Sequence, residues 1–308
     1  MNSIINDGRR IRPVNDLLFR RVLGNAQHPD ITKGFISSML GIEVKDVFIE
    51  NPYSIDLYKN LDGEMIHRNT VVDVLVSLDN GSRVIVEMQT TKQAHFIQRE
   101  LFYVASRYAD QYGAFNKSRQ SGTAESLYGS LYPVHAICVL DFMLFTENDD
   151  PLSHFVLYDI EHGRTIGNHS GTAGIDSLIS LSFLELPKPY ARAGGSIMHW
   201  IDFFHGHPLD ENAPDYFEAA YRLVSEQDWS FEEKMMIDYY ELAEADRLAQ
   251  IDYGRQEGFE QGLEQGLEQS RHDIARAALL KGFSLDCVAE LTGLAVTDLA
   301  KLQTDSIE

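Results

Sequence analysis

Two apolar, β-branched runs flank the polar triplet Asp79-Asn80-Gly81 within residues 71–89, which read VVDVLVSLDNGSRVIVEMQ. Such runs on either side of Asn-Gly predict a β-hairpin. Because side chains alternate between the two faces of a strand, one face of this hairpin is rich in valine. The other face carries polar groups where a purely structural strand would carry more apolar ones, and Glu87 and Gln89 share it. The hairpin is therefore the first place to look for chemistry.

The register of the hairpin decides whether Asp73 joins them. A two-residue turn at Asn80-Gly81 would pair Asp73 with Met88 and place the carboxylates on opposite faces. A three-residue loop, closed by Gly81 in the left-handed region, pairs Asp73 with Glu87 instead. We predict the three-residue loop, which sets the two carboxylates directly opposite each other with Cβ atoms roughly 5 Å apart.

Two carboxylates this close repel each other unless a cation lies between them, and hard oxygen ligands suit Mg²⁺. The alternative is that Asp73 and Glu87 simply face water on a two-stranded ribbon. Leu75 and Ile85 lie on the same face and favour partial burial, where unpaired carboxylates are costly. We therefore predict a metal site that contains Asp73 and Glu87.

Helices and strands alternate through the first 190 residues. Asn15 is a favourable N-cap for a helix over Asp16–Leu23 that ends at Gly24. The remaining expected elements are helices at His28–Leu40 and Ala94–Tyr112, a loop at residues 113–130, and strands at Val44–Glu50, Tyr132–Leu140, His154–Ile160 and Leu178–Leu186. The continuous apolar character of Tyr132–Leu140 and His154–Ile160 predicts the buried centre of a mixed sheet.

The last 118 residues look helical and form an extension. Pro187-x-Pro189 marks the predicted boundary, which divides the chain into a core (1–190), an acidic helical region (191–270) and a small helical tail (271–308). Glycines recur every four residues in EGFEQGLEQGLEQ, which places Phe259, Leu263 and Leu267 on one stripe. We expect a solvated helical arm that pairs with a second helix, as a homodimer would supply.

Charge distribution limits the choice of partners. The formal charge is −21, but residues 1–120 hold 15 Lys+Arg and 14 Asp+Glu, a net of +1, so the acidity belongs to the second part of the chain. This composition does not predict tight sequence-independent DNA binding. No apolar run reaches the roughly 20 residues of a membrane span. The two cysteines, Cys138 and Cys287, lie among apolar residues, and we expect reduced, buried thiols in a cytoplasmic protein.

Asp73, thirteen residues, then Glu87-x-Gln89 across a hairpin resembles the PD-(D/E)XK nuclease signature, in the branch where Gln replaces the terminal Lys. The order of the other segments also matches: NDLLFR from residue 15, RELFY from residue 99, YGSLYPVHAICVLDFMLF from residue 128, and the Gly-periodic tail. Together they resemble the Rpn family of recombination-promoting nucleases, also called PD-(D/E)XK family transposases, over essentially the whole chain.

The resemblance implies a restriction-endonuclease-like α/β fold, with a mixed sheet flanked by helices, and an all-helical C-terminal extension. It implies a metal-dependent DNA endonuclease that uses Mg²⁺, with Mn²⁺ as a possible substitute and no organic cofactor. Asp73, Glu87 and the main-chain carbonyl of Met88 would hold the ion. Asp16 would join the site from the first helix, or alternatively only cap that helix. The tail resembles small helix-turn-helix units, although residues 271–308 hold four Lys+Arg against six Asp+Glu.

The helix after the hairpin should begin beside the metal site, so Gln98, Arg99 and Tyr103 are candidates to reach a scissile phosphate. The alternative is that Arg99 is a surface charge and Tyr103 packs in the core. Gln89 occupies the usual Lys position, and an amide can orient a water but cannot accept its proton. The identity of the general base is therefore open. A DNA-binding accessory or protein-interaction module with a weak or inactive nuclease site is the alternative function.

Overall fold

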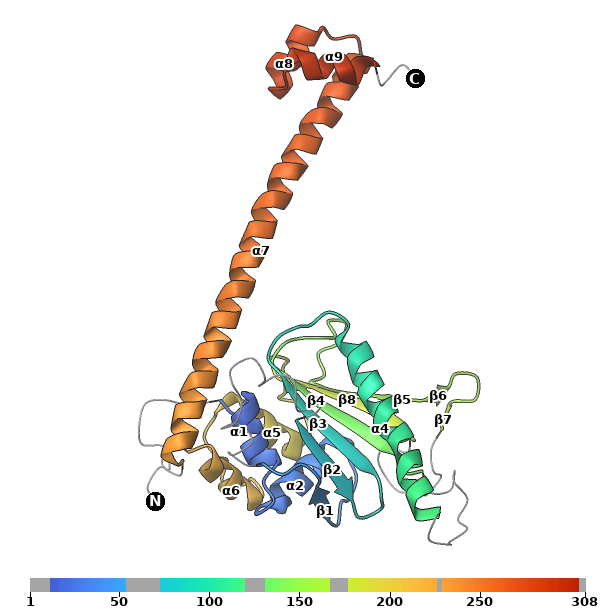
Figure 1. Cartoon of the computed structure of the whole chain (residues 1–308), viewed down its shortest axis with the longest axis vertical. Coiled ribbons are helices and arrows are strands. Elements are labelled where there is room, and N and C mark those ends of the chain that lie inside the picture. The colour runs from blue at the N-terminus through green and yellow to red at the C-terminus, as the bar shows by residue number, and fades with distance from the viewer. Residues whose placement is uncertain (1–11, 54–72, 120–130, 167–176, 226–228, 305–308) are drawn as a thin grey trace. The chain divides into compact units, whose positions relative to one another are not determined.

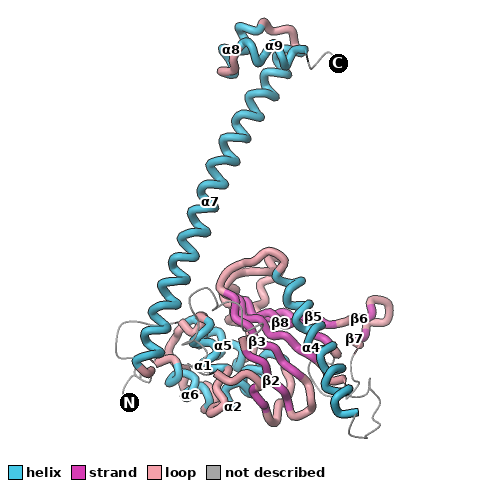
Figure 2. The backbone as a smooth tube through the Cα atoms, viewed as in Figure 1, coloured by secondary structure: helices cyan, strands magenta, loops and turns pink. Residues whose placement is uncertain are grey.

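The computed structural model describes residues 12–53, 73–119, 131–166, 177–225 and 229–304 (Figure 1). The chain divides into two compact units, the first of which ends at Tyr240 and the second of which begins at Glu241. The first unit contains a mixed sheet and its flanking helices, and the second is helical (Figure 2). Among the described helices, none combines the length and the apolar character that a membrane crossing requires.

The main sheet has six strands in the order β1-β2-β3-β4-β8-β5. The pairs β1/β2, β2/β3 and β5/β8 are antiparallel, whereas β3/β4 and β4/β8 are parallel. A separate two-stranded sheet pairs β6 with β7. The strands are β1 (Val47–Ile49), β2 (Val74–Leu78), β3 (Arg83–Gln89), β4 (Val134–Leu140), β5 (Leu152–Val156), β6 (Tyr158–Asp159), β7 (Arg164–Thr165) and β8 (Ile179–Glu185).

Helices cover both faces of this sheet (Figure 1). One face packs against α1 (Asp16–Leu23), α2 (Pro29–Leu40), α5 (Gly195–His205) and α6 (Tyr216–Leu223), and alternate valines of β2 and β3 point into that core. The other face packs against α4 (Phe96–Arg119), with Leu75 and Ile85 beneath it. The predicted mixed sheet flanked by helices is confirmed.

The N-terminal helices follow their local signals closely. Asn15 caps α1, and its side-chain oxygen accepts a hydrogen bond from the backbone N–H of Leu18 at 2.8 Å. Gly24 ends α1, and Gly41 ends α2 with φ of 64°, a conformation that suits glycine. Capping chemistry is local, and for this reason these boundaries could be predicted from the sequence.

Three predictions in the first unit need correction. β5 lies at the edge of the sheet and is only partly buried, so Leu152–Val156 is not a central strand as predicted for His154–Ile160. Helix α4 continues to Arg119 instead of ending at Tyr112. The compact unit also extends past residue 190 to Tyr240, because side chains of α5 and α6 such as Trp200 and Phe217 are fully buried in the same core.

Helix α7 (Phe231–Leu280) begins in the first unit and continues into the second. Its start carries a reciprocal cap: Ser230 Oγ accepts from the Glu233 N–H at 3.2 Å, and Glu233 Oε2 accepts from the Ser230 N–H at 2.8 Å. Arg21 of α1 forms an ion pair with Glu233. Leu17 and Leu18 of α1 share a buried cluster with residues at this start, Trp229 and Ile237. The start of α7 therefore belongs to the packing of α1.

The second unit consists of the rest of α7, α8 (Leu285–Thr292) and α9 (Val296–Thr304). Described side chains from residue 242 to 270 are exposed, apart from the half-buried Arg247. A small core of Ala275, Val288 and Leu299 joins the end of α7 to the two short helices. Gly282 and Gly293 separate these helices with φ of 84° and 72°.

Candidate active site

The hairpin loop has the predicted three-residue form. Gly81 has φ of 86°, and its N–H donates to the Leu78 carbonyl at 2.9 Å. Leu78 N–H donates to the Ser82 carbonyl at 2.8 Å, and Leu75 pairs with Ile85. The same register places Asp73, which immediately precedes β2, opposite Glu87 in β3. The predicted register is confirmed.

Asp73 is held from two sides. Its carboxylate oxygen Oδ2 accepts a hydrogen bond from the Met88 backbone N–H at 2.9 Å. The Asn51 side chain donates to the Asp73 carbonyl at 3.3 Å and accepts from the Leu75 N–H at 2.6 Å. Met88 therefore contacts Asp73 through its N–H group, while the predicted role of the Met88 carbonyl as a metal ligand stays a prediction.

Glu87 lies in a buried group of carboxylates. It is only 4% exposed, and its Oε1 atom has no hydrogen-bond partner among the described residues. Glu100 of α4 is 0% exposed and lies within hydrogen-bonding reach of Glu87. The Cys138 thiol of β4 donates to Glu100 Oε2 at 3.6 Å. Helix α4 thus adds a buried acid to the predicted pair.

Glu100 is the site residue that sequence reasoning missed. It follows Arg99 on α4 and reads as an ordinary helical surface acid. However, Phe96 and Val104, four residues before and after it, are both buried. Residues four apart share one helix face, so an acid within an apolar stripe was the available signal.

Burial and mutual repulsion disturb the titration of these acids. Burial, together with the smaller effect of the Asp16 charge, raises the pKa of Asp73 to about 7, although the Met88 N–H and Arg20 oppose this rise. Burial raises the pKa of Glu87 well above its ordinary range, and Glu100 and Asp73 add to that rise. Burial also raises the pKa of Glu100, against the opposing charge of Arg99. The cluster therefore holds more negative charge than its neighbours offset.

Arg99 and Tyr103 lie beside this cluster, as predicted for the helix after the hairpin. The Arg99 guanidinium donates to Glu100 Oε1 at 3.2–3.3 Å and lies over the Phe96 and Tyr103 rings, 5.2 and 6.0 Å from their centroids. Tyr103 also packs against the core under α4, and contact of either residue with a scissile phosphate stays a prediction. Arg99 is a partly exposed cation at the edge of the acidic cluster.

The two predicted glutamines differ in position. Gln89 Oε1 accepts from Gln93 at 3.2 Å, and Gln93 in turn contacts Arg99. Gln89 is therefore linked to the cation beside the acids. Gln98 is exposed and lies on the opposite side of α4 from Glu100, given 3.6 residues per turn. The structure does not bring Gln98 to the site.

Helix α1 contributes both a carboxylate and a cation. Asp16 is exposed in the first turn of α1, yet its charge reaches Asp73. Arg20, one turn later, is 4% exposed, and its Nη2 atom has no hydrogen-bond partner among the described residues. Its charge also reaches Asp73. Both predicted readings of Asp16, capping turn and site carboxylate, are compatible with this position.

The donor set fits a hard divalent cation. Among the described residues, no three His, Cys, Asp or Glu side chains form a ready-made coordination sphere. The unpartnered Glu87 Oε1, however, is a buried carboxylate oxygen beside two other acids, and such an atom is costly without a partner. Carboxylate oxygens are the ligands that Mg²⁺ prefers. Asp73 and Glu87 are the residues that would hold it.

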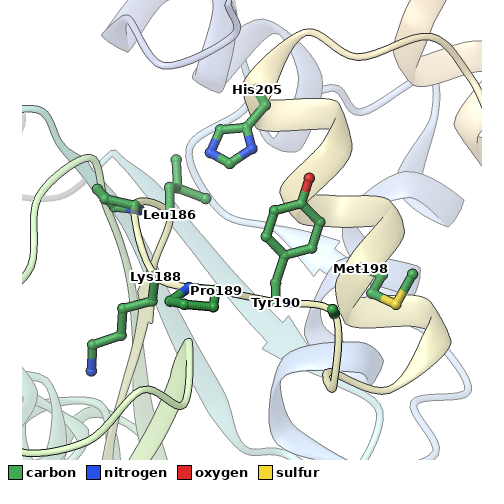
Figure 3. Close-up of a pocket in the computed structure, with 8 residues that line it drawn as sticks. Leu186, Lys188, Pro189, Tyr190, Met198 and His205 are labelled. Carbon is green, nitrogen blue, oxygen red and sulfur yellow. The ribbon is translucent and has the colours of Figure 1, made fainter.

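Other polar groups in the first unit are structural or separate from the acids. His135 and His154 contact Ser180 and Ser182 at 2.7 and 2.9 Å. Figure 3 shows a pocket of about 760 Å³ between the segment after β8 and helix α5. Its lining is Leu186, Pro187, Lys188, Pro189, Tyr190, Ala191, Met198 and His205. This pocket is not lined by Asp16, Asp73, Glu87 or Glu100.

Comparison with known proteins agrees with this geometry. Residues 13–215 match the family model described as PD-(D/E)XK nuclease family transposase. No curated protein and no solved structure matches the chain. The family match covers the sheet, Asp16 of α1, the hairpin with its acids, and α4. The chain belongs to the PD-(D/E)XK nuclease family transposases.

Proposed function

We propose that this protein is a Mg²⁺-dependent DNA endonuclease that hydrolyses phosphodiester bonds in recombination or in the movement of mobile elements. The observation that carries the proposal is the hairpin register, which sets Asp73 opposite Glu87, whose buried Oε1 has no hydrogen-bond partner among the described residues. Family membership supports a nuclease, and the identity of the ion and the endonucleolytic cut are our proposals.

Each residue of the site has a defined part in this proposal. Asp73 and Glu87 bind the divalent ion, and Mn²⁺ would fit the same oxygen ligands. An ion held there would supply polarisation of a phosphate and a lowered pKa for a bound water. Arg99, held by Glu100 beside the acids, offers its guanidinium to a phosphate oxygen. Met88 N–H and Asn51 keep Asp73 in place.

Gln89 cannot serve as the general base that accepts a proton from the attacking water. Its amide can accept or donate a hydrogen bond and so orient a water, but it is neither a base nor a cation at neutral pH. The link from Gln89 through Gln93 to Arg99 restricts the orientation of the amide. We infer that Gln89 positions the attacking water and that its proton leaves to a phosphate oxygen or to solvent.

The same glutamine favours a second candidate function, a DNA-binding or protein-interaction module with a weak nuclease site. An exposed apolar stripe on α7 supports this alternative, because Phe259, Leu263 and Leu267 are 72%, 55% and 54% exposed. We infer that a second copy of the chain covers this stripe in a homodimer. Sedimentation velocity of Leu263→Glu against the natural chain measures whether the stripe holds two copies together.

Plasmid nicking with and without Mg²⁺ tests the nuclease proposal. Asp73→Asn removes a charged ligand with little change in shape, so the Mg²⁺-dependent nicking rate should fall by roughly 100-fold or more. Asp110→Asn is the matched control, because Asp110 is a surface acid of α4 whose ion pair within the described residues is with Arg107. The control should nick at the rate of the natural chain.

Two outcomes would contradict the proposal. Nicking that is equal in Asp73→Asn and in the natural chain would assign the activity to a contaminant or to another site. Absence of Mg²⁺-dependent nicking together with salt-dependent DNA binding would favour the binding module instead.

A further inference from the structure

Among the described residues, two buried polar atoms near Asp73, one on an acid and one on a base, have no hydrogen-bond partner. One is the acceptor Glu87 Oε1, and the other is the donor Nη2 of Arg20; both side chains are 4% exposed. Buried guanidinium groups are normally paired, because an unpaired buried charge costs several kcal/mol or more. The proposed cation accounts for Glu87. The Arg20 donor requires a separate explanation.

The backbone places Arg20 next to the acids. It lies four residues after Asp16, on the same face of α1. The end of α1 is tied to the segment that positions Asp73: the Tyr53 N–H donates to the Gly24 carbonyl at 2.7 Å, and Asn51 bonds the backbone around Asp73. Arg20 therefore has a fixed position at the acidic cluster.

Arg21 shows what a fully engaged arginine in this helix looks like. It is 8% exposed, forms an ion pair with Glu233, and donates from Nε to the Leu223 carbonyl at 2.9 Å. Arg20 has similar burial, yet its Nη2 atom has no such partner among the described residues. The difference between two adjacent arginines indicates that Arg20 is held ready for an anion absent from the free protein.

We propose that Arg20 is a substrate-binding residue that donates a hydrogen bond from its guanidinium to a phosphate oxygen of the DNA backbone at the Asp73–Glu87 site. The proposal rests on the proposed nuclease function. Arginine suits this role because its planar fork of donors matches phosphate geometry and its charge persists in a buried site. Phosphate and metal ion would then satisfy the two unpartnered atoms together.

A different role for Arg20 predicts different measurements. If Arg20 only offsets the repulsion of the acids, its loss would weaken the fold without a specific effect on DNA. If it binds phosphate, its loss weakens DNA binding, while the removal of a positive charge leaves cation binding equal or stronger. The signs of these two effects separate the roles.

The experiment measures binding of a fluorescein-labelled DNA duplex to the full chain by anisotropy, with Ca²⁺ in place of Mg²⁺ to support binding without cleavage. Arg20→Gln should weaken DNA binding about tenfold and reduce the slope of log affinity against log salt by about 1. Arg20→Lys should recover part of the affinity, since it keeps the charge but loses the fork. Calorimetric Ca²⁺ affinity of Arg20→Gln should be equal or higher.

Two control variants accompany these measurements. Arg107→Gln removes a surface arginine of α4 and should bind DNA as the natural chain does. Arg21→Gln should lower the melting temperature but keep the salt slope. DNA affinity and slope of Arg20→Gln equal to those of the natural chain would overturn this proposal alone. A natural chain that neither binds nor nicks DNA would overturn it together with the proposed function.

Discussion

Glutamates occur in two very different settings in this molecule. Glu87 and Glu100 are 4% and 0% exposed under α4, and burial raises the pKa of each. Glu260 and Glu264 lie on the exposed part of α7, where Glu260 accepts a hydrogen bond from Gln256 one turn earlier at 3.1 Å. The first pair is buried among like charges, whereas the second lies on an exposed helix surface. Acidic composition alone therefore says little about metal binding; burial decides it.

Glu87→Gln should give the largest effect among the variants that test this contrast. The variant should lose Mg²⁺-dependent nicking by roughly 100-fold or more, yet the cation-free protein should gain about 1–2 kcal/mol of unfolding free energy, because a buried repulsive charge is gone. Nicking assays and urea denaturation in EDTA measure both effects. Glu260→Gln should change neither, and a loss of stability in Glu87→Gln would contradict the repulsion argument.

Glycines allow a second comparison of the two regions. Gly81→Ala should cost about 2 kcal/mol, since φ is 86° and the added Cβ would lie 2.5 Å from the Tyr132 ring. Gly262→Ala in the arm meets nothing within 4 Å and should add helical stability of about 0.5–1 kcal/mol. Urea denaturation and far-UV circular dichroism measure these opposite signs. Equal effects would mean that the hairpin loop tolerates a left-handed alanine.

The pH dependence of stability tests the acids of the site directly. Asp73 has a pKa of about 7 in the folded chain against 3.8 ordinarily, so between these values the folded state binds more protons than the unfolded state. The unfolding free energy of the cation-free protein should therefore fall as pH rises from about 4 to 7. Urea titrations in EDTA across this range measure the slope. Asp73→Asn should reduce this slope without abolishing it, because burial also raises the pKa of Glu87 and Glu100, whereas Asp79→Asn, at an exposed acid of the same hairpin, should leave it unchanged.

The hairpin could be predicted because its determinants are local. A glycine after Asp79-Asn80 fixes the loop, the loop fixes the register, and the register sets Asp73 opposite Glu87. The caps of α1 and α2 could be predicted for the same reason. In each case, a few adjacent residues carry the required chemistry.

Features that depend on packing between distant parts of the chain could not be predicted from the sequence. Glu100 becomes a site residue only because α4 lies on the sheet above Cys138. Apolar character alone could not show that β5 lies at an edge, since the neighbour of a strand is set by topology. Cys287, expected to be buried, is half-exposed in the small helical unit. The unpartnered nitrogen of Arg20 is likewise visible only in three dimensions.

The reciprocal cap at the start of α7 has a practical consequence for dissecting the protein. Glu233, which completes that cap and pairs with Arg21, lies beyond residue 215, where the family match ends. A fragment that ends at residue 215 would lack Trp229 and Ile237, which pack against Leu17 and Leu18. The apolar face of α1 that carries these two leucines would then be exposed to water. Such a fragment would loosen the helix that bears Asp16 and Arg20, so an inert truncation would say nothing against catalysis by the intact chain.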